Sequence, residues 1–351
     1  MGEHDDEKPT IERRDLLKLG TAATVGYLAR SVVPEASGAM PPLPANPVTP
    51  RAMPTRNLGR TGYRVGIFSL GGQAAVEQPN NEAVAVPIVE KALDLGVNYI
   101  DTSARYGGAE RWSERYIGQV MRRRRSEAFL ATKTHDRTRD GSLKLLEKSL
   151  ELLHTDHVDL WQIHNLARHE EVEQIFAADG AVQALVKARE QGMVRFVGVT
   201  GHADPSVLME AIRRFPFDIV LMALNAADPH HLSFERELLP LAVEREMGIV
   251  GMKIPARGRI LSTWTPPPPE QQRWGQIATR SGTITMREAM RYVLSRPVST
   301  VIVGCDTVAQ VEEDVQLARA FTPLNEMQMA EIAARTEPIK RQALFFRRWE
   351  G

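Results

Sequence analysis

The feature of this sequence that most constrains its fold is a regular alternation of short apolar runs with amphipathic segments, from Arg56 onward. The apolar runs recur at roughly 25- to 40-residue intervals, and the segments between them show the 3.6-residue rhythm of helices. This alternation is typical of a parallel sheet wound with helices. The expected strands are 65–70, 98–101, 128–133, 158–164, 194–200, 219–224, 249–253 and 300–303, and the expected helices are 82–95, 111–123, 142–153, 181–191, 205–214, 235–246, 286–294 and 308–320.

Eight strand–helix repeats favour a closed (β/α)8 TIM barrel over an open doubly wound sheet. An open dinucleotide-binding sheet would also need a GxGxxG motif after its first strand, which this sequence lacks. Gly59 and Gly62 predict a β-hairpin that plugs the N-terminal end of the barrel. Residues 325–335 predict a helix that leads into a C-terminal tail folded back across the barrel.

Charge and cysteine content exclude several classes of protein. The 44 basic residues balance the 44 acidic ones, so no global field would attract nucleic acid or an anionic membrane. The basic run 122–125 is expected to be the solvated end of a helix. The single cysteine, Cys305, excludes an intrachain disulfide and a cysteine-based metal cluster.

Reactive side chains follow three successive expected strands. Asp101, Lys133 and His164 stand at the strand ends, and Tyr106 follows in the loop after Asp101. The carboxyl ends of barrel strands supply the catalytic groups in enzymes of this fold. Taken singly, each residue also suits a structural role, as a helix cap, a packed aromatic, a surface lysine or a buried histidine.

Together the four side chains suit one reaction, in which a phenol donates a proton. A nearby cation lowers the pKa of a phenol, and Lys133 is the expected cation for Tyr106. Asp101 would hold Lys133 charged and oriented. His164, as a neutral imidazole, would hydrogen-bond the substrate oxygen.

Three segments resemble the signatures of the aldo/keto reductase family: DTSARYGGAERWSERYIG at 101–118, FLATK at 129–133 and VDLWQIH at 158–164. The resemblance covers about residues 54 to 320 and carries the family's Asp, Tyr, Lys and His onto the four residues above. It implies a (β/α)8 barrel that transfers hydride between NAD(P)H and a small-molecule carbonyl. NADP(H) is the expected cofactor, with NAD(H) as the alternative.

The segment VIVGCDTVAQVEED at 301–314 is similar to the family's adenosine-phosphate loop, with Gly304 at the turn before a helix N-terminus. Thr307 stands where many members have a lysine for the 2′-phosphate, and Leu224 where many have an aromatic ring beside the nicotinamide. Arg257 or Arg259 is a further candidate for the phosphates. The residues expected at the cofactor are Gly72, Thr200, His202, Asn225, Lys253, Gly304, Asp306, Gln310 and Glu313.

The N-terminal residues predict an export signal rather than part of the fold. ERRDLLK at 12–18 resembles the twin-arginine (Tat) signal, and Ser37 and Ala39 offer the small residues of a cleavage site. The apolar stretch 19–29 is too short to span a bilayer. A periplasmic or exported location through the Tat machinery is expected, with a cytoplasmic location as the alternative.

These patterns divide the chain into a signal at 1–39, a linker at 40–53 and a barrel at 54–351. Two rival functions remain at this point. The first is a barrel hydrolase, whose metal could be bound by Asp101, His164, His202 and the pair His230 and His231. The group of Asp101, Tyr106, Lys133 and His164 itself predicts no metal. The second rival function is that of a nicotinamide-binding barrel with little turnover.

Overall fold

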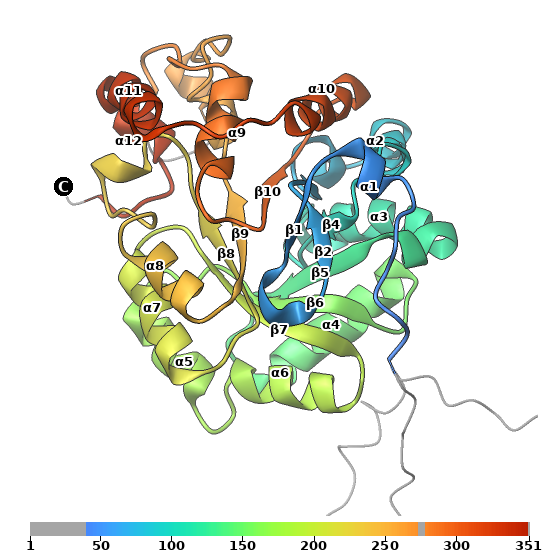
Figure 1. Ribbon diagram of the computed structural model, residues 1–351. Helices are drawn as coiled ribbons and strands as arrows, with labels where there is room; N and C mark the ends of the chain where they lie inside the picture. The colour runs from blue at the N-terminus through green and yellow to red at the C-terminus, as the bar shows by residue number, and fades with distance from the viewer. Residues whose placement is uncertain (1–39, 273–277, 350–351) are drawn as a thin grey trace, which may run out of the picture.

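The computed structural model describes residues 40–272 and 278–349, and its core is a closed barrel of eight parallel strands (Figure 1). Each strand pairs with the next along the chain, and the last pairs with the first. The (β/α)8 architecture expected from the sequence is therefore confirmed. In barrel order the strands are β3 (Phe68–Gly71), β4 (Tyr99–Asp101), β5 (Phe129–Thr134), β6 (Val158–Ile163), β7 (Val194–Gly201), β8 (Ile219–Ala223), β9 (Gly248–Met252) and β10 (Thr300–Val303).

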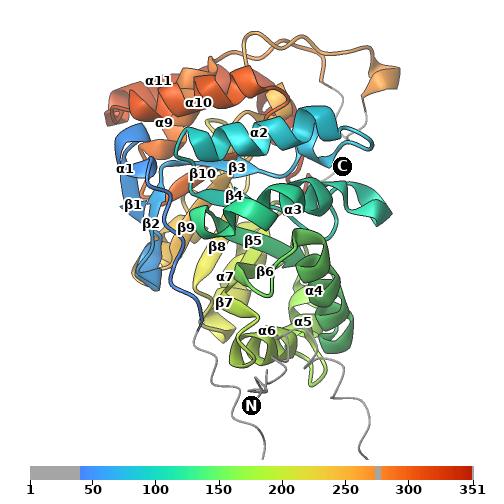
Figure 2. The same ribbon diagram turned by 90° about the vertical axis from the view of Figure 1, so that its right-hand side faces the viewer.

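Helices cover the outside of the barrel, and α10, α2, α3, α4 and α6 pack against one another in this order (Figure 2). Several begin at a side-chain cap, as at Thr138, Thr285 and Thr307, whose hydroxyls accept from backbone N–H groups. The helices are α1 (Thr49–Ala52), α2 (Glu82–Asp94), α3 (Trp112–Arg124), α4 (Arg139–Leu153), α5 (His169–Phe176), α6 (Ala181–Glu190), α7 (Pro205–Arg214), α8 (Leu238–Glu244), α9 (Met286–Leu294), α10 (Val308–Arg319), α11 (Glu326–Thr336) and α12 (Lys340–Ala343).

Helix α5 is absent from the sequence-based prediction. It has eight residues and buries only Val172 and Ile175, so its apolar rhythm is too short to recognise. Glu171 fixes its start as one half of a capping box, because its carboxylate accepts from the backbone N–H of Arg168 at 3.1 Å. The connection from β6 to β7 thus contains two helices, α5 and α6.

A hairpin of β1 (Thr55–Asn57) and β2 (Arg64–Gly66) closes the N-terminal end of the barrel. The expected strand 65–70 was wrong in one respect, since its first residues belong to the hairpin and only β3 enters the barrel. Gly59 has a φ of +54°, and a Cβ there would lie 2.2 Å from the backbone nitrogen of Gly248. The turn therefore requires glycine to approach β9 this closely.

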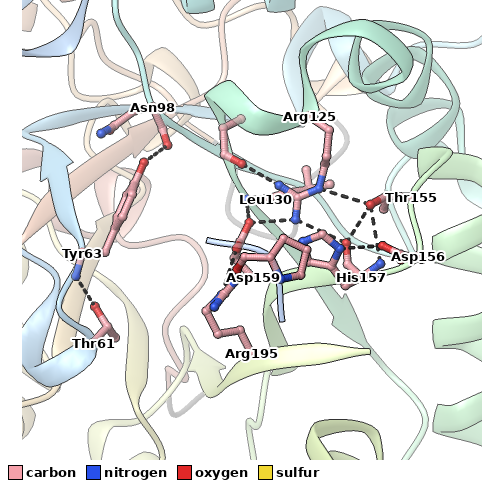
Figure 3. Close-up of polar contacts among 12 residues, drawn as sticks. Thr61, Tyr63, Asn98, Arg125, Leu130, Thr155, Asp156, His157, Asp159 and Arg195 are labelled. Carbon is pink, nitrogen blue, oxygen red and sulfur yellow. Dashed lines mark hydrogen bonds and ion pairs between the residues drawn. The ribbon is translucent and has the colours of Figure 1, made fainter. Parts of the chain in front are cut away.

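A polar cluster at the end of the barrel where the strands begin centres on Asp159, which is fully buried near the start of β6 (Figure 3). Arg125 donates to one carboxylate oxygen at 2.8 Å and the Leu130 N–H to the same oxygen at 2.9 Å. Arg195 approaches the other oxygen at 3.4 Å. The basic run 122–125 is therefore not wholly a solvated helix end, because Arg125 turns inward to neutralise a buried charge.

The part of the chain expected to be a linker packs against the barrel. The Asn46 side-chain amide donates to Leu93 O at 2.7 Å, and the Thr49 hydroxyl donates to Gly96 O at 2.9 Å. Leu43 packs against the apolar cluster inside the barrel. Residues 40–53 thus form part of the folded unit, whereas the expected signal at 1–39 lies outside the described residues. Over those residues, the structure contains no helix that is long and apolar enough to cross a membrane.

Candidate active site

The catalytic candidates meet at the rim where the parallel strands end. Asp101 closes β4 and is in register with Ala131 of β5, two residues before Lys133. His164 follows the last residue of β6. A cavity of about 1070 Å³ opens at this rim, and both Asp101 and Tyr106 line it. The closure of the barrel therefore brings together the four residues that the sequence separates.

Asp101 and Lys133 form a buried ion pair, with exposed side-chain fractions of 3% and 1%. The Lys133 ammonium donates to an Asp101 carboxylate oxygen and, at 2.7 Å, to Thr102 O. Gln162 approaches the other carboxylate oxygen at 3.4 Å. Burial lowers the pKa of Lys133, and the charge of Asp101 opposes that change. The ammonium nitrogen also lies 4.9 Å from the centroid of the Tyr106 ring.

The pKa of Tyr106 lies well above its ordinary value, first because of burial and then because of the charges of Asp101 and Glu77. The expected lowering of this pKa by a nearby cation was therefore wrong. Burial, together with the charges of Asp101 and Glu77, outweighs the effect of the nearby cations on the pKa of the phenol. Tyr106 is thus held in its protonated form, which is the form that a proton donor needs.

His164 is buried, and its ring meets that of Tyr106 edge-on at a centroid distance of 5.7 Å. Burial, followed by the charge of Lys133, lowers its pKa well below the ordinary value. The imidazole is therefore neutral, as expected from the sequence. Its Nδ1 lies 3.1 Å from the hydroxyl oxygen of Ser103.

Six of the nine residues expected at the cofactor line the same cavity as Tyr106. They are Gly72, Lys253, Gly304, Asp306, Gln310 and Glu313. Burial, followed by the charge of Arg257, lowers the pKa of Lys253 to about 8, and its amine donates to the Gln73 side chain at 3.2 Å. The cavity thus extends from the tetrad to the N-terminus of α10, with cationic groups along its wall.

Thr200, His202 and Asn225 are not among the residues that line this cavity. The Thr200 hydroxyl accepts from the Asn165 N–H at 2.7 Å, and His202 bonds to the Asn165 side-chain oxygen at 2.7 Å. Asn225 donates to Ala343 O at 3.1 Å. These three side chains bind other parts of the protein.

Sequence reasoning missed several residues at the site. Asn165 connects the ends of β6 and β7 with a φ of +54°, and Gln73 bonds both Lys253 and Glu77. Asp314 lines the cavity with a pKa raised to about 7, mainly by burial. Among these, only Asp314 had a sequence signal, because it lies within the phosphate-loop segment.

The C-terminal tail forms one wall of the rim. The Arg347 guanidinium is fully buried against the Asp228 carboxylate, and it also donates to His202 O at 2.5 Å and Ala223 O at 3.0 Å. These two carbonyls lie just beyond β7 and at the end of β8. The tail therefore folds back across the barrel as expected, and it ties two strand ends together.

The rival metal site does not assemble in the structure. His230 bonds to Ala333 O at 2.8 Å, and His231 bonds to Arg348 O at 2.6 Å and stacks on Trp349. Over residues 40–272 and 278–349, no three His, Cys, Asp or Glu side chains gather in a metal-binding arrangement. His230 thus binds helix α11, and His231 binds the C-terminal tail.

Comparison with known proteins agrees with this geometry. The chain is 28% identical to L-galactose dehydrogenase from Arabidopsis thaliana over 320 residues, covering 81% of this chain and 95% of that protein. An aldo-keto reductase from Bacillus halodurans in its holo form superimposes with a TM-score of 0.66 at 24% identity, covering 80% of this chain and 96% of its own. Glycerol dehydrogenase from Gluconobacter oxydans gives a TM-score of 0.67 at 21% identity, covering 82% and 97%.

The sequence profile of the aldo/keto reductase family matches residues 64–337, which span the barrel from β2 to the end of α11. The matched region includes all four rim residues and the loop that leads into α10. The chain therefore belongs to the aldo/keto reductase family of NAD(P)H-dependent oxidoreductases.

Proposed function

We propose that this protein reduces the carbonyl group of a small aldehyde, ketone or quinone, with Tyr106 as the general acid. The observation that carries the proposal is the shared cavity, which Tyr106 and Asp101 line together with the phosphate-loop residues. A proton donor and a dinucleotide site in one cavity meet the spatial requirement for reduction of a bound carbonyl.

The cavity suits a nicotinamide dinucleotide. Glycines that line the cavity where β3 and β10 end let the two backbones approach closely: a Cβ on Gly71 would lie 3.2 Å from Gly304 N, and one on Gly304 would lie 3.2 Å from the Gln73 carbonyl carbon. The first turn of α10 offers backbone N–H groups to a phosphate, and Lys253 and Arg257 add positive charge. When bound, the cofactor would supply the hydride.

The protein's own groups would control the proton. His164, which is neutral, would donate a hydrogen bond to the carbonyl oxygen and orient it. As negative charge develops on that oxygen, Tyr106 would transfer its hydroxyl proton. Burial makes the Tyr106 phenol a weaker acid, but the transfer remains downhill because a substrate alkoxide is a stronger base than a phenolate. Lys133, held by Asp101, would stabilise the phenolate that forms.

Cofactor preference can be proposed from the charge of the α10 end. Asp306, Glu313 and Asp314 line the cavity there, and Thr307 contributes a hydroxyl rather than a cation. NADP(H) is the cofactor that the family resemblance favours, and these carboxylates would weaken its advantage over NAD(H). Titrating the protein with each nucleotide and comparing the dissociation constants would measure the difference.

The activity is tested with Tyr106→Phe in single-turnover reactions. The protein would be mixed with NADPH or NADH and a panel of aldehydes, ketones and quinones, and nucleotide oxidation followed by absorbance. We expect the parent to oxidise nucleotide with at least one substrate and the variant to lose turnover. Both proteins should still bind the nucleotide equally, as measured by fluorescence quenching on titration. Equal turnover in the two proteins would refute the role of Tyr106. Binding without turnover in the parent would favour a nicotinamide-binding barrel.

We also propose export through the Tat machinery, which rests on the sequence of residues 1–39 alone. Arg13 and Arg14 would be replaced together by lysine in the full chain, and the periplasmic fraction of the protein compared with that of the parent. We expect the replacement to abolish export. Equal export of both proteins would contradict the proposal.

A further inference from the structure

The protonation of His164 determines what it can offer a substrate. Burial keeps the ring neutral, so one ring nitrogen carries a proton and the other carries a lone pair. If the proton is on Nε2, then Nε2 can donate a hydrogen bond to a carbonyl oxygen. If the proton is on Nδ1 instead, Nε2 can only accept one. The partner of Nδ1 therefore matters for catalysis.

That partner is Ser103, in the turn between β4 and Tyr106. The Ser103 side chain is fully buried, and its hydroxyl oxygen lies 3.1 Å from His164 Nδ1. The backbone N–H of Arg105 donates to the same oxygen at 3.2 Å. Among the residues that the structure describes, these are the two side-chain hydrogen bonds of Ser103.

These contacts leave one direction for the hydroxyl proton. The Arg105 N–H can only donate, so it cannot receive the proton of Ser103. A buried hydroxyl proton without an acceptor is costly, by about 1–3 kcal/mol in general. His164 Nδ1 is the remaining partner, and accepting the proton requires a lone pair on that nitrogen.

We propose that Ser103 is a positioning residue that holds His164 with its proton on Nε2, so that the imidazole donates to the substrate oxygen. The inference deepens the proposed function and rests on it for the identity of the oxygen. The same turn also carries the proton donor, because the Tyr106 N–H donates to Ser103 O at 3.0 Å. One short segment thereby positions both Tyr106 and His164, the two groups that would face the carbonyl.

The test measures the tautomer directly, without turnover. Nitrogen NMR of histidine-labelled protein distinguishes a protonated ring nitrogen from an unprotonated one, and a His164→Gln spectrum assigns the signals. We expect Nδ1 of His164 to be unprotonated in the parent and both tautomers to be present in Ser103→Ala. Protonated Nδ1 in the parent, or an unchanged tautomer in the variant, would overturn the proposal.

Kinetics provide the second readout. Ser103→Ala should lower kcat about three- to tenfold, the range that corresponds to losing one neutral hydrogen bond, while the nucleotide dissociation constant stays unchanged. Ser103→Thr, which restores a hydroxyl, should recover the parent tautomer. An unchanged kcat in Ser103→Ala would overturn the claim that Ser103 supports turnover through His164. Failure of the proposed function would be seen separately, as turnover in Tyr106→Phe.

Ser69→Ala is the matched control. Ser69 is also a fully buried serine, and its hydroxyl shares one hydrogen bond of 2.8 Å with Thr300 on the adjacent strand, β10. Its loss should affect stability about as much as that of the Ser103 hydroxyl, but leave the His164 signals unchanged. If this control shifted the tautomer equally, the effect would be a general loosening of the barrel, and the assignment to Ser103 would fail.

Discussion

Replacing Arg347 by methionine should destabilise the fold strongly, although the residue lies only four positions from the C-terminus. The substitution leaves the fully buried Asp228 carboxylate without its cation and removes the donors to His202 O and Ala223 O. Removing one partner of a buried ion pair typically costs about 3–5 kcal/mol. Asp228 keeps three donors, from the Ser233 hydroxyl and the N–H groups that follow it, so we expect the lower half of that range.

The measurement is urea-induced unfolding followed by circular dichroism, on the parent, Arg347→Met, Asp228→Asn and the double variant. Because the double variant no longer buries an isolated charge, its loss of stability should fall short of the sum of the two single losses by about 1–3 kcal/mol. Additive effects within about 0.5 kcal/mol would refute the reasoning. So would an Arg347→Met protein as stable as the parent.

The adjacent residue provides a control within the same tail. Arg348 pairs with Asp204, but its side chain is 55% exposed. Exposed ion pairs contribute about 0–1 kcal/mol, because water screens the charges and the long side chain loses freedom. Arg348→Met should therefore leave the unfolding midpoint nearly unchanged. A loss equal to that of Arg347→Met would mean that tail packing, rather than the buried ion pair, explains both.

Three further predictions concern single side chains. Burial lowers the pKa of Lys253 to about 8, so the affinity for nucleotide should fall as the pH rises through about 8. Lys253→Met should bind nucleotide more weakly and should not show this pH dependence. Identical fluorescence-titration profiles for the two proteins would contradict the prediction. Burial raises the pKa of Asp314 to about 7, so its contribution to stability is full below the unfolded value of about 4 and is lost as pH rises through 7. Asp314→Asn should therefore be about 2–4 kcal/mol more stable than the parent at pH 8 and lose the corresponding slope, and parallel stability–pH curves would refute this. Asn46→Ala should lower the free energy of unfolding by about 1–3 kcal/mol in urea titrations, because it removes the buried hydrogen bonds of its side-chain amide to Leu93 O and Val97 O; no change would mean that residues 40–53 contribute little.

The sequence by itself determined the barrel and the rim positions of its reactive groups. Strands of a closed parallel barrel are buried on both faces, so most of their residues are apolar, and a reactive polar residue close to the C-terminal end of such a run is visible in the sequence. Asp101, Lys133 and His164 mark such ends, and parallel pairing places all such ends at one rim. The short helix α5 escaped prediction because local periodicity fades below about three turns.

Only the tertiary structure decided the environment of each reactive group. The direction of the Tyr106 pKa depends on burial and on the charges of Asp101 and Glu77, and neither is encoded in local spacing. Thr200 lies near the end of β7 and Asn225 lies just beyond β8, yet their side chains bind other segments of the protein. The ion pair of Arg347 with Asp228 joins residues 119 positions apart. Such contacts arise from three-dimensional packing, whereas the periodic pattern of a sequence reports only on neighbours along the chain.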